Sequence, residues 1–331
     1  MRLLVVKTSS LGDVLHALAA VTDAARAVPG LRCDWLVEEA FAEIPAWHPA
    51  VGRVIPCALR RWRKNIRAAR ASGEWARFKQ ELQREPYDLV LDAQGLIKSA
   101  WLASMARGTR AGPDWAAARE PWASLFYQQR LKIPARESAH AVDRLRALFA
   151  LGLGYPLPQT ASDFGLDRAR FTAPQIRPPY AVFLHATTWV SKQWPLAQWQ
   201  ELGLSLRGQG IQVVLPWGTA AEREHALKIG SAFNGHVPEP QTLTQLAGWL
   251  AHSRFVVGVD TGLAHLAAAL KTPSVTLYGP TLPTLTGTVG ANQIHLSATR
   301  ENTVDRKRPT TVTVAQVQEA LTSLPDRAAK V

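Results

Sequence analysis

The fold is decided by the stretch Phe255-Val256-Val257-Gly258-Val259-Asp260-Thr261-Gly262-Leu263-Ala264-His265-Leu266, which predicts a strand, a short loop and the start of a helix. Its apolar first residues are typical of a parallel strand that is buried on both faces. Asp260 and Thr261 are helix-capping residue types, and Gly262 allows a sharp turn or the close approach of a ligand. A helix N-terminus at the carboxyl end of a parallel strand is where α/β folds bind phosphates. The plainer alternative is that the loop only caps the helix and that His265 is a buried histidine.

The same alternation of strand and helix patterns runs along both halves of the chain. Strands are expected at residues 3–6, 33–37, 53–56, 87–91, 180–184, 211–215, 255–259 and 274–277, and helices at 13–27, 75–84, 97–107, 140–151, 196–207, 220–232, 243–251, 263–270 and 314–323. A proline-rich, weakly patterned stretch within 152–179 is typical of a linker. We therefore predict an α/β chain with two doubly wound domains, 1–160 and 175–312, that face a central cleft, followed by a helical segment at 313–331.

The composition is that of an ordinary soluble globular protein with a basic balance of charge. Hydrophobic residues make up 47% of the 331 residues and charged residues 19%, and no apolar run reaches the roughly 18–20 residues of a transmembrane helix. Cys33 and Cys57 allow one bridge at most, and without an export signal we expect two reduced thiols in the cytoplasm. The net charge of +12 favours an anionic partner, which is nucleic acid, an acidic membrane surface or a phosphorylated substrate.

The first expected strand ends in the turn Lys7-Thr8-Ser9-Ser10-Leu11-Gly12-Asp13. This turn is neither a Walker A loop nor a G-x-G-x-x-G motif. Asp13 has two interpretations at the start of the following helix. It is either a helix cap, which is worth about 1 kcal/mol, or a carboxylate placed to accept the proton of a substrate hydroxyl.

Basic residues gather in the segment Arg60-Arg61-Trp62-Arg63-Lys64-Asn65-Ile66-Arg67, where five of eight side chains are cationic. Most segments of this kind are solvated surface. Their density here, with a tryptophan inserted, favours binding of the phosphates of a large acidic ligand. Lys98 and Arg119 are candidates to extend the same surface.

The second half carries hydroxyls and a lysine after its first expected strand, in His185-Ala186-Thr187-Thr188-Trp189-Val190-Ser191-Lys192. Such a loop suits a diphosphate, with Lys192 neutralising the charge of a leaving group. The alternative is an exposed loop lysine. Glu222, after the next strand, either caps its helix or accepts hydrogen bonds from a ribose. The sequence contains no metal-ligand motif and no G-x-S-x-G elbow, so neither metal catalysis nor a serine triad has support.

Taken together, these motifs resemble the lipopolysaccharide heptosyltransferases of glycosyltransferase family 9. The resemblance covers nearly the whole chain and is carried by residues 6–16, 60–64, 92–96, 118–121, 191–195 and 259–266. It implies the GT-B fold, with the acceptor on the first Rossmann-like domain and the nucleotide-sugar on the second. It also implies inverting, metal-independent transfer of L-glycero-D-manno-heptose from ADP-heptose to the first Kdo residue of Kdo-lipid A in lipopolysaccharide inner-core biosynthesis, without a cofactor.

The resemblance further implies where the protein works. We expect a monomer that associates peripherally with the cytoplasmic face of the inner membrane and binds no nucleic acid. The basic charge agrees with an acceptor that is a phosphorylated glycolipid in an anionic leaflet. The final helix, 314–323, is expected to pack back onto the first domain.

Roles are carried over onto the matching positions of this chain. Asp13 matches the general base, and Lys192 matches the group that stabilises the leaving diphosphate. The expected donor contacts are Thr187, Thr188, Lys192, Glu222, Gln241, Asp260, Thr261, Gly262 and His265. The expected acceptor contacts are Ser10, Gly12, Arg60, Arg61, Arg63, Lys64, Gln94, Lys98 and Arg119, and no metal site is expected.

Two alternatives stay open at this point. The chain is compatible with a later-acting heptosyltransferase or with a GT-B enzyme that uses another nucleotide-sugar. The basic charge is also compatible with a nucleic-acid-binding protein, although the sequence has no zinc-finger or RNP pattern and no convincing recognition helix.

Overall fold

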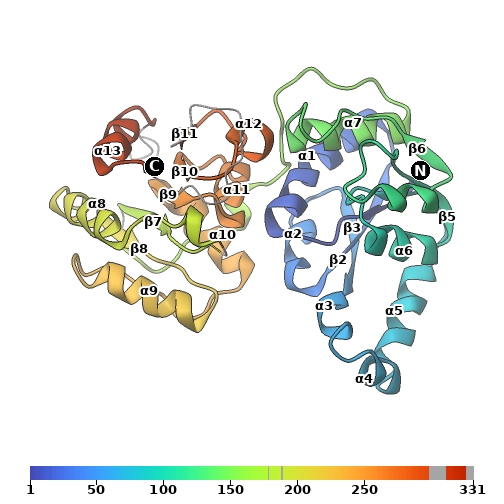
Figure 1. The fold of residues 1–331 in the computed structure, drawn as a ribbon, viewed down its shortest axis with the longest axis horizontal. Helices are drawn as coiled ribbons and strands as arrows, with labels where there is room; N and C mark the ends of the chain where they lie inside the picture. The colour runs from blue at the N-terminus through green and yellow to red at the C-terminus, as the bar shows by residue number, and fades with distance from the viewer. Residues whose placement is uncertain (178, 188, 298–310, 326–331) are drawn as a thin grey trace. The chain divides into compact units, whose positions relative to one another are not determined.

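The computed structural model describes residues 1–177, 179–187, 189–297 and 311–325. Internal contacts divide the chain into a first unit, Met1–Leu166, and a second unit, Asp167–Val331 (Figure 1). Each unit is built on a parallel sheet and has its own core, so each is described by itself below.

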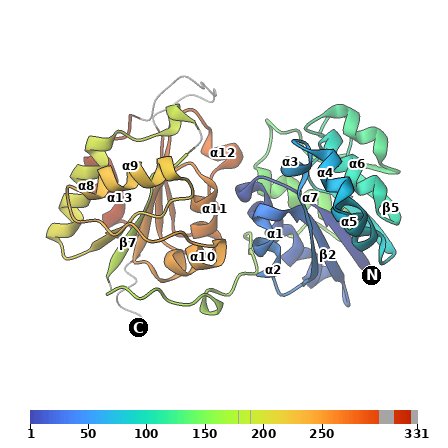
Figure 2. The ribbon, with the colours of Figure 1, turned by 90° about the horizontal axis from the view of Figure 1, so that it is seen from below.

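The first unit is organised around a parallel sheet in the order β3-β2-β1-β4-β5-β6. Its strands are β1 (Arg2–Val6), β2 (Arg32–Glu38), β3 (Val51–Cys57), β4 (Tyr87–Asp92), β5 (Gly108–Pro113) and β6 (Gln129–Leu131). Its helices are α1 (Leu11–Ala27), α2 (Glu43–Ala46), α3 (Leu59–Trp62), α4 (Ile66–Ala71), α5 (Glu74–Gln83), α6 (Ile97–Met105) and α7 (Ala141–Leu153), with the 3₁₀ turns η1 (Glu39–Phe41) and η2 (Pro121–Phe126). α1 and α7 pack together on one face, and α5 and α6 pack on the other (Figure 2). The strand order reverses between β1 and β4.

The second unit has a parallel sheet in the order β11-β10-β9-β7-β8 within its described residues. Its strands are β7 (Tyr180–Leu184), β8 (Gln212–Val214), β9 (Phe255–Val259), β10 (Ser274–Tyr278) and β11 (Gln293–Ser297). Its helices are α8 (Leu196–Gly208), α9 (Ala220–Gly230), α10 (Leu243–His252), α11 (Gly262–Ala269), α12 (Pro283–Thr286) and α13 (Val314–Thr322), with η3 (Arg168–Arg170) and η4 (Val190–Lys192). α8, α9 and α13 share one face of the sheet (Figure 2), and α10 packs against α11. Here the order reverses between β7 and β9.

The strands predicted from sequence are all present, and β7 and β9 match to the residue. The prediction did not include β5, β6 or β11. β6 has three residues, and β11 is a half-buried edge strand with polar residues at alternate positions. Such strands form because a neighbouring strand pairs with them, so their own sequence carries little signal.

The final helix packs within the second unit. α13 buries Val314, Val317 and Ala320 in the core of the second unit and packs against α8, β10 and β11. Gln318 Nε2 donates to Ser205 Oγ of α8 at 2.8 Å. A contact of this helix with the first domain, which the resemblance implied, stays a prediction.

Two further expectations concern the cysteines and the membrane. Cys33 and Cys57 are buried, unbridged thiols in β2 and β3, and burial raises the pKa of both. In the part of the chain that the structure describes, no helix combines the length and the apolar character needed to span a membrane.

Candidate active site

Each sheet reverses its strand order once, and the predicted site residues follow the strands at that point. In the first unit these are the loop after β1, which leads to Asp13, and the loop after β4, which contains Gln94. In the second unit they are the loop after β7, which contains Lys192, and Asp260 after β9. Ligands of open α/β sheets bind outside the carboxyl ends of strands at such a reversal. Each unit therefore has one candidate substrate site.

Asp13 lies at the start of α1 with its two carboxylate oxygens in different surroundings. Oδ2 accepts hydrogen bonds from the backbone N–H and the hydroxyl of Ser10, both at 2.9 Å. Oδ1 lies 3.9 Å from Lys7 Nζ. Burial opposes the charged form, but Lys7 and the Ser10 hydrogen bonds outweigh it and hold the pKa of Asp13 below its ordinary value. Asp13 thus caps the helix through one oxygen and presents the other as an ionised acceptor.

Lys7 is a buried cation beneath this carboxylate. Its ammonium donates to the carbonyl oxygen of Ala93 in the loop after β4, at 3.0 Å. Burial lowers its pKa, whereas the negative charges of Asp13 and Asp92 act in the opposite direction. The lysine therefore ties the two loops of the reversal together and places a positive charge beside Asp13.

Gln94 and Asp92 fix the geometry of the loops. Gln94 is buried, and its Oε1 accepts hydrogen bonds from the backbone N–H groups of Thr8 and Ser9 at 3.1 and 3.2 Å. Asp92 accepts hydrogen bonds from the Gln94 backbone at 2.8 Å and from the Tyr127 hydroxyl at 2.6 Å. Gln94 therefore holds the turn before Asp13, a role that sequence reasoning did not assign to it.

The basic segment is anchored by Trp62, which is buried against the rings of Trp75 and Phe78. This leaves Arg63 and Lys64 exposed. They lie exposed in the link between α3 and α4, a position compatible with contact to an anionic ligand.

Arg60 and Arg61 have different surroundings. Arg61 is held between two carboxylates, those of Glu39 and Glu74, with contacts of 2.9 Å to each. Its charge is already neutralised, so it is a weaker candidate for an acceptor phosphate than its neighbours. Arg60 donates its backbone N–H to Glu38 Oε1 at 3.0 Å, and its guanidinium lies 5.3 Å from the ring centre of Phe41.

Further cations converge on the same end of the first sheet. Arg60 and Lys98 both act on Glu38, the last residue of β2: burial raises the pKa of Glu38, and the positive charges of Arg60 and Lys98 oppose that shift. Arg119 and Arg144 both lower the pKa of Lys7, after the larger effect of its burial. Arg144 was not singled out from the sequence because it lies in α7, outside any recognisable motif. The site thus offers an ionised carboxylate within a field of positive charge.

The second unit has its own lysine–aspartate pair. Lys192 Nζ lies 2.6 Å from Asp260 Oδ2, which also accepts a hydrogen bond from Thr281 Oγ1 at 2.7 Å. The other carboxylate oxygen lies 3.8 Å from His265 Nε2. Lys192 also lies 4.7 Å from the ring centre of Trp189. The structure thus brings together three of the residues expected to bind the donor and adds Thr281.

The remaining hydroxyl-bearing residues expected to bind the donor follow β7 and β9 in the sequence. Thr261 is the N-cap of α11, and Gly262 is its first residue, so the free N–H groups of the helix point at the carboxyl edge of the sheet. Thr187 is half-buried in the loop after β7. Thr188, which was expected to contact the diphosphate, lies outside the described residues. A helix N-terminus beside a lysine provides the donors that a diphosphate requires.

Glu222 and Gln241 use their polar atoms within the protein. Glu222 Oε2 accepts hydrogen bonds from the backbone N–H groups of Gly218 and Thr219 at 2.7 and 3.0 Å. Glu222 is therefore part of a capping box, as one of the two sequence interpretations proposed. Gln241 accepts a hydrogen bond from Trp249 Nε1 at 3.2 Å and donates to a backbone carbonyl two residues away at 2.8 Å.

The pair His185 and His225 was not predicted to be part of the site. His185 ends the strand segment at β7, and its ring centre lies 5.3 Å from that of His225 on α9. Burial lowers the pKa of His185 to about 4, and the neighbouring His225 acts in the same direction. Burial also lowers the pKa of His225, so both rings are neutral near pH 7.

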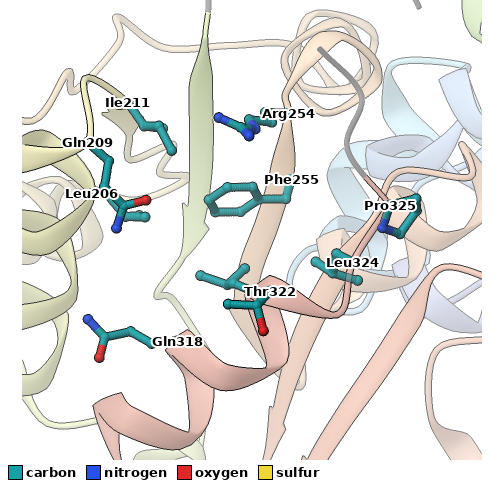
Figure 3. A pocket seen from close by; sticks show the side chains of 10 residues that line it. Leu206, Gln209, Ile211, Arg254, Phe255, Gln318, Thr322, Leu324 and Pro325 are labelled. Carbon is teal, nitrogen blue, oxygen red and sulfur yellow. The ribbon is translucent and has the colours of Figure 1, made fainter. Parts of the chain in front are cut away.

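A pocket of about 480 Å³ in the second unit lies at the other end of the strands. Figure 3 shows its lining, in which Ile211 lies just before β8, Phe255 begins β9, and Gln318 and Leu324 come from the region of α13. Since the donor loops follow the carboxyl ends of the strands, this pocket is separate from the candidate donor site. Among the described residues, no group of three or more His, Cys, Asp or Glu side chains is arranged to hold a metal ion.

Comparison with known proteins agrees with this geometry. Residues 75–315 match the family model described as "Glycosyltransferase family 9 (heptosyltransferase)". Lipopolysaccharide heptosyltransferase 1 of Pseudomonas aeruginosa is 54% identical over 300 residues, which cover 90% of this chain and 84% of that protein. Lipopolysaccharide heptosyltransferase 2 of Escherichia coli K12 matches over 103 residues, 29% of this chain, at 36% identity.

Solved structures of Escherichia coli heptosyltransferase WaaC share the fold. The structure with ADP has a TM-score of 0.89 and 47% identity, and it covers 97% of this chain and 99% of its own. The structure with ADP-2-deoxy-2-fluoro heptose has a TM-score of 0.86 and 46% identity over the same shares of the two chains. The prediction of a GT-B fold, two Rossmann-like domains each built on a parallel sheet, is confirmed.

Proposed function

The chain belongs to glycosyltransferase family 9, the heptosyltransferases, and on that premise we propose that it transfers L-glycero-D-manno-heptose from ADP-heptose to the first Kdo residue of Kdo-lipid A. Asp13 carries the proposal, because an ionised oxygen of this residue lies at the carboxyl edge of the first sheet beside Lys7, whose own pKa is lowered mainly by burial and further by Arg119 and Arg144. The acceptor is itself acidic, so Lys7, which helps keep Asp13 ionised, and the nearby Arg119 and Arg144 also favour its binding.

The reaction is a single displacement with inversion. Asp13 Oδ1 removes the proton of the attacking Kdo hydroxyl, and the anomeric carbon passes through an oxocarbenium-like state. ADP departs with its charge stabilised by Lys192 and by the N-terminus of α11. Asp260 holds Lys192 at 2.6 Å before the donor binds, so the ammonium is fixed in the loop that receives the diphosphate.

The remaining assignments are part of the same proposal. The proposed donor contacts are Thr187, Thr188, Asp260, Thr261, Gly262 and His265, together with Lys192. The proposed acceptor contacts are Ser10, Gly12, Arg60, Arg61, Arg63, Lys64, Gln94, Lys98 and Arg119, with Arg144 added from the structure; Arg61 is the weakest of the cations because Glu39 and Glu74 already pair with it. Glu222 and Gln241 contact the nucleoside through surfaces that their internal hydrogen bonds leave available. The enzyme acts as a monomer without a metal or cofactor, at the cytoplasmic face of the inner membrane.

The test is an incubation of the purified protein with ADP-heptose and de-acylated Kdo-lipid A in the presence of a chelator. The expected result is release of ADP and a mass gain of one heptose on the acceptor, both lost in Asp13→Asn. ADP binding without transfer would exclude this acceptor while keeping the donor site. Transfer only to an acceptor that already carries heptose would identify a later-acting heptosyltransferase.

A salt-dependent DNA gel shift, run beside an ADP titration, separates the enzyme from a nucleic-acid-binding protein. We expect saturable ADP binding and no sequence-independent shift at physiological salt. The reverse pattern would contradict the proposed function.

A further inference from the structure

We propose that the first unit carries a docking surface for an anionic lipid bilayer, formed by Ile97, Trp101, Trp115, Trp122 and Leu125 and here called the aromatic patch. The proposal rests on the proposed function, because a bilayer is where a lipid A acceptor resides. All five side chains are exposed. Three of the four tryptophans that are exposed among the described residues belong to this patch, so the exposure is concentrated rather than scattered.

The first part of the patch is the outer face of α6. Ile97 and Trp101 are four residues apart, so they lie on the same side of the helix. The ring of Trp101 stacks on Trp75 of α5, with ring centres 5.6 Å apart and planes at 12°. The stacking fixes the indole against the protein, while Trp101 stays 42% exposed.

The second part comes from the segment that follows β5. Trp115 and Trp122 contact each other edge to face with ring centres 5.0 Å apart. Trp122 and Leu125 belong to η2, and their side chains are 61% and 56% exposed. A fixed pair of exposed tryptophans is costly in water, which indicates that another apolar phase covers it.

The two parts form one surface because η2 packs directly on α6. Ala100 of α6 and Ala123 of η2 are buried in one small cluster. The backbone N–H of Ile97 donates to Glu120 Oε2 at 2.7 Å, just before η2 begins. These contacts place Ile97 beside the segment that carries Trp122.

The charges around the patch favour a lipid surface over a protein partner. Lys98, Arg119, Arg130 and Lys132 are exposed in or beside the same segments, and the carboxylate of Glu120 is occupied by α6. Tryptophan side chains prefer the headgroup region of bilayers, and each nearby cation adds about 1 kcal/mol of attraction to an anionic leaflet. Because Lys98 and Arg119 are also proposed acceptor contacts, the patch adjoins the place where the sugar end of a glycolipid would bind.

The experiment is flotation of the full chain with vesicles of phosphatidylcholine alone and of phosphatidylcholine with phosphatidylglycerol. The double variant Trp122→Ser/Leu125→Ser removes the most exposed part of the patch. The matched control, Leu204→Ser/Leu227→Ser, removes two leucines of the second unit that are 51% and 46% exposed. We expect about a tenfold or greater loss of binding to the anionic vesicles for the patch variant and no loss for the control.

Other outcomes would overturn the proposal. Equal vesicle binding by the patch variant, the control and the unmodified chain would show that the patch does not meet the bilayer. A dimer that the patch variant dissociates, without a change in vesicle binding, would assign the patch to a second copy of the chain.

A transfer assay separates this proposal from the proposed function. The patch variant should keep its turnover on de-acylated acceptor and lose turnover on acceptor embedded in vesicles. Absence of heptose transfer by the unmodified chain would contradict the proposed function. The flotation result would still show whether the aromatic patch binds an anionic bilayer.

Discussion

The two units each place a lysine and an aspartate where their sheets reverse, but the pairs are built in opposite ways. In the first unit Lys7 is buried and stands 3.9 Å from Asp13, whose other oxygen is held by Ser10. In the second unit Lys192 and Asp260 are in direct contact at 2.6 Å, and Asp260 also binds Thr281. One pair leaves an aspartate oxygen available, and the other holds a lysine in place.

This difference matches two different chemical needs. A base that accepts a proton must present an oxygen that is ionised and not already saturated with hydrogen bonds. A group that stabilises a leaving diphosphate must present positive charge in a fixed position. The structure therefore predicts that Asp13 and Lys192 are the reacting members of their pairs and that Lys7 and Asp260 position them.

The largest effect is expected from Asp13→Asn. The amide retains the size of the side chain but cannot accept the proton, so kcat should fall by about 10²–10⁴-fold, while ADP affinity by calorimetry stays unchanged. The matched control is Asp143→Asn, because Asp143 is an exposed carboxylate in the first turn of α7. Equal losses in ADP affinity and in kcat would mean that Asp13 acts only through the structure of the first unit.

Lys192→Met should weaken both donor binding and turnover. Removing one preorganised donor to a developing negative charge costs about 10²–10³-fold in kcat. Asp260→Asn should reduce kcat by less than Lys192→Met does, because Lys192 keeps its charge and loses only its fixed position. Lys228→Met serves as control, since Lys228 is paired with Glu224 on the surface of α9. Unchanged affinity for ADP-heptose in Lys192→Met would remove this lysine from the donor site.

Lys7→Met should change the pH dependence of kcat/KM more than the value of kcat/KM at neutral pH. Lys7 helps hold the pKa of Asp13 below its ordinary value, and the ionised form is the active one, so activity is lost as the pH falls through that pKa. Without the lysine that pKa rises, and the acid limb of kcat/KM moves to higher pH. Lys7→Arg keeps the charge and should keep the limb in place. If the acid limb of kcat/KM stays at the same pH in Lys7→Met, Lys7 acts only through its hydrogen bond to Ala93.

The same comparison shows what the sequence could predict. Asp260 directly follows an apolar strand, and Asp13 and Lys192 lie within a short loop of one, so the strand pattern brings them to the carboxyl edge of a sheet. The central strands were predictable for the same reason, because buried parallel strands have a continuous apolar sequence. The edge strands β6 and β11 were not, because pairing with a neighbour rather than composition makes them strands.

The partners of the site residues were less accessible to sequence reasoning. Arg61 looked available for a phosphate, yet Glu39 lies 22 residues away and neutralises it. Gln94 holds the backbone at Thr8 across 86 residues, and Thr281 reaches Asp260 across 21. Such contacts depend on how the strands are ordered, which residue types at a local spacing do not specify.

The smallest predicted effect concerns Glu222, which caps α9 and is also proposed to contact the nucleoside. The capping box with Thr219 should contribute about 1 kcal/mol to the free energy of unfolding, so Thr219→Ala should lose about that amount in a denaturant titration. Glu222→Gln keeps an oxygen for the cap and removes the charge, so its stability should change less. If Glu222 also contacts the nucleoside, Glu222→Gln should weaken ADP binding at unchanged stability. An unchanged ADP affinity would leave Glu222 as a helix cap alone and confine the charged contacts of the donor site to Lys192 and the loop after β9.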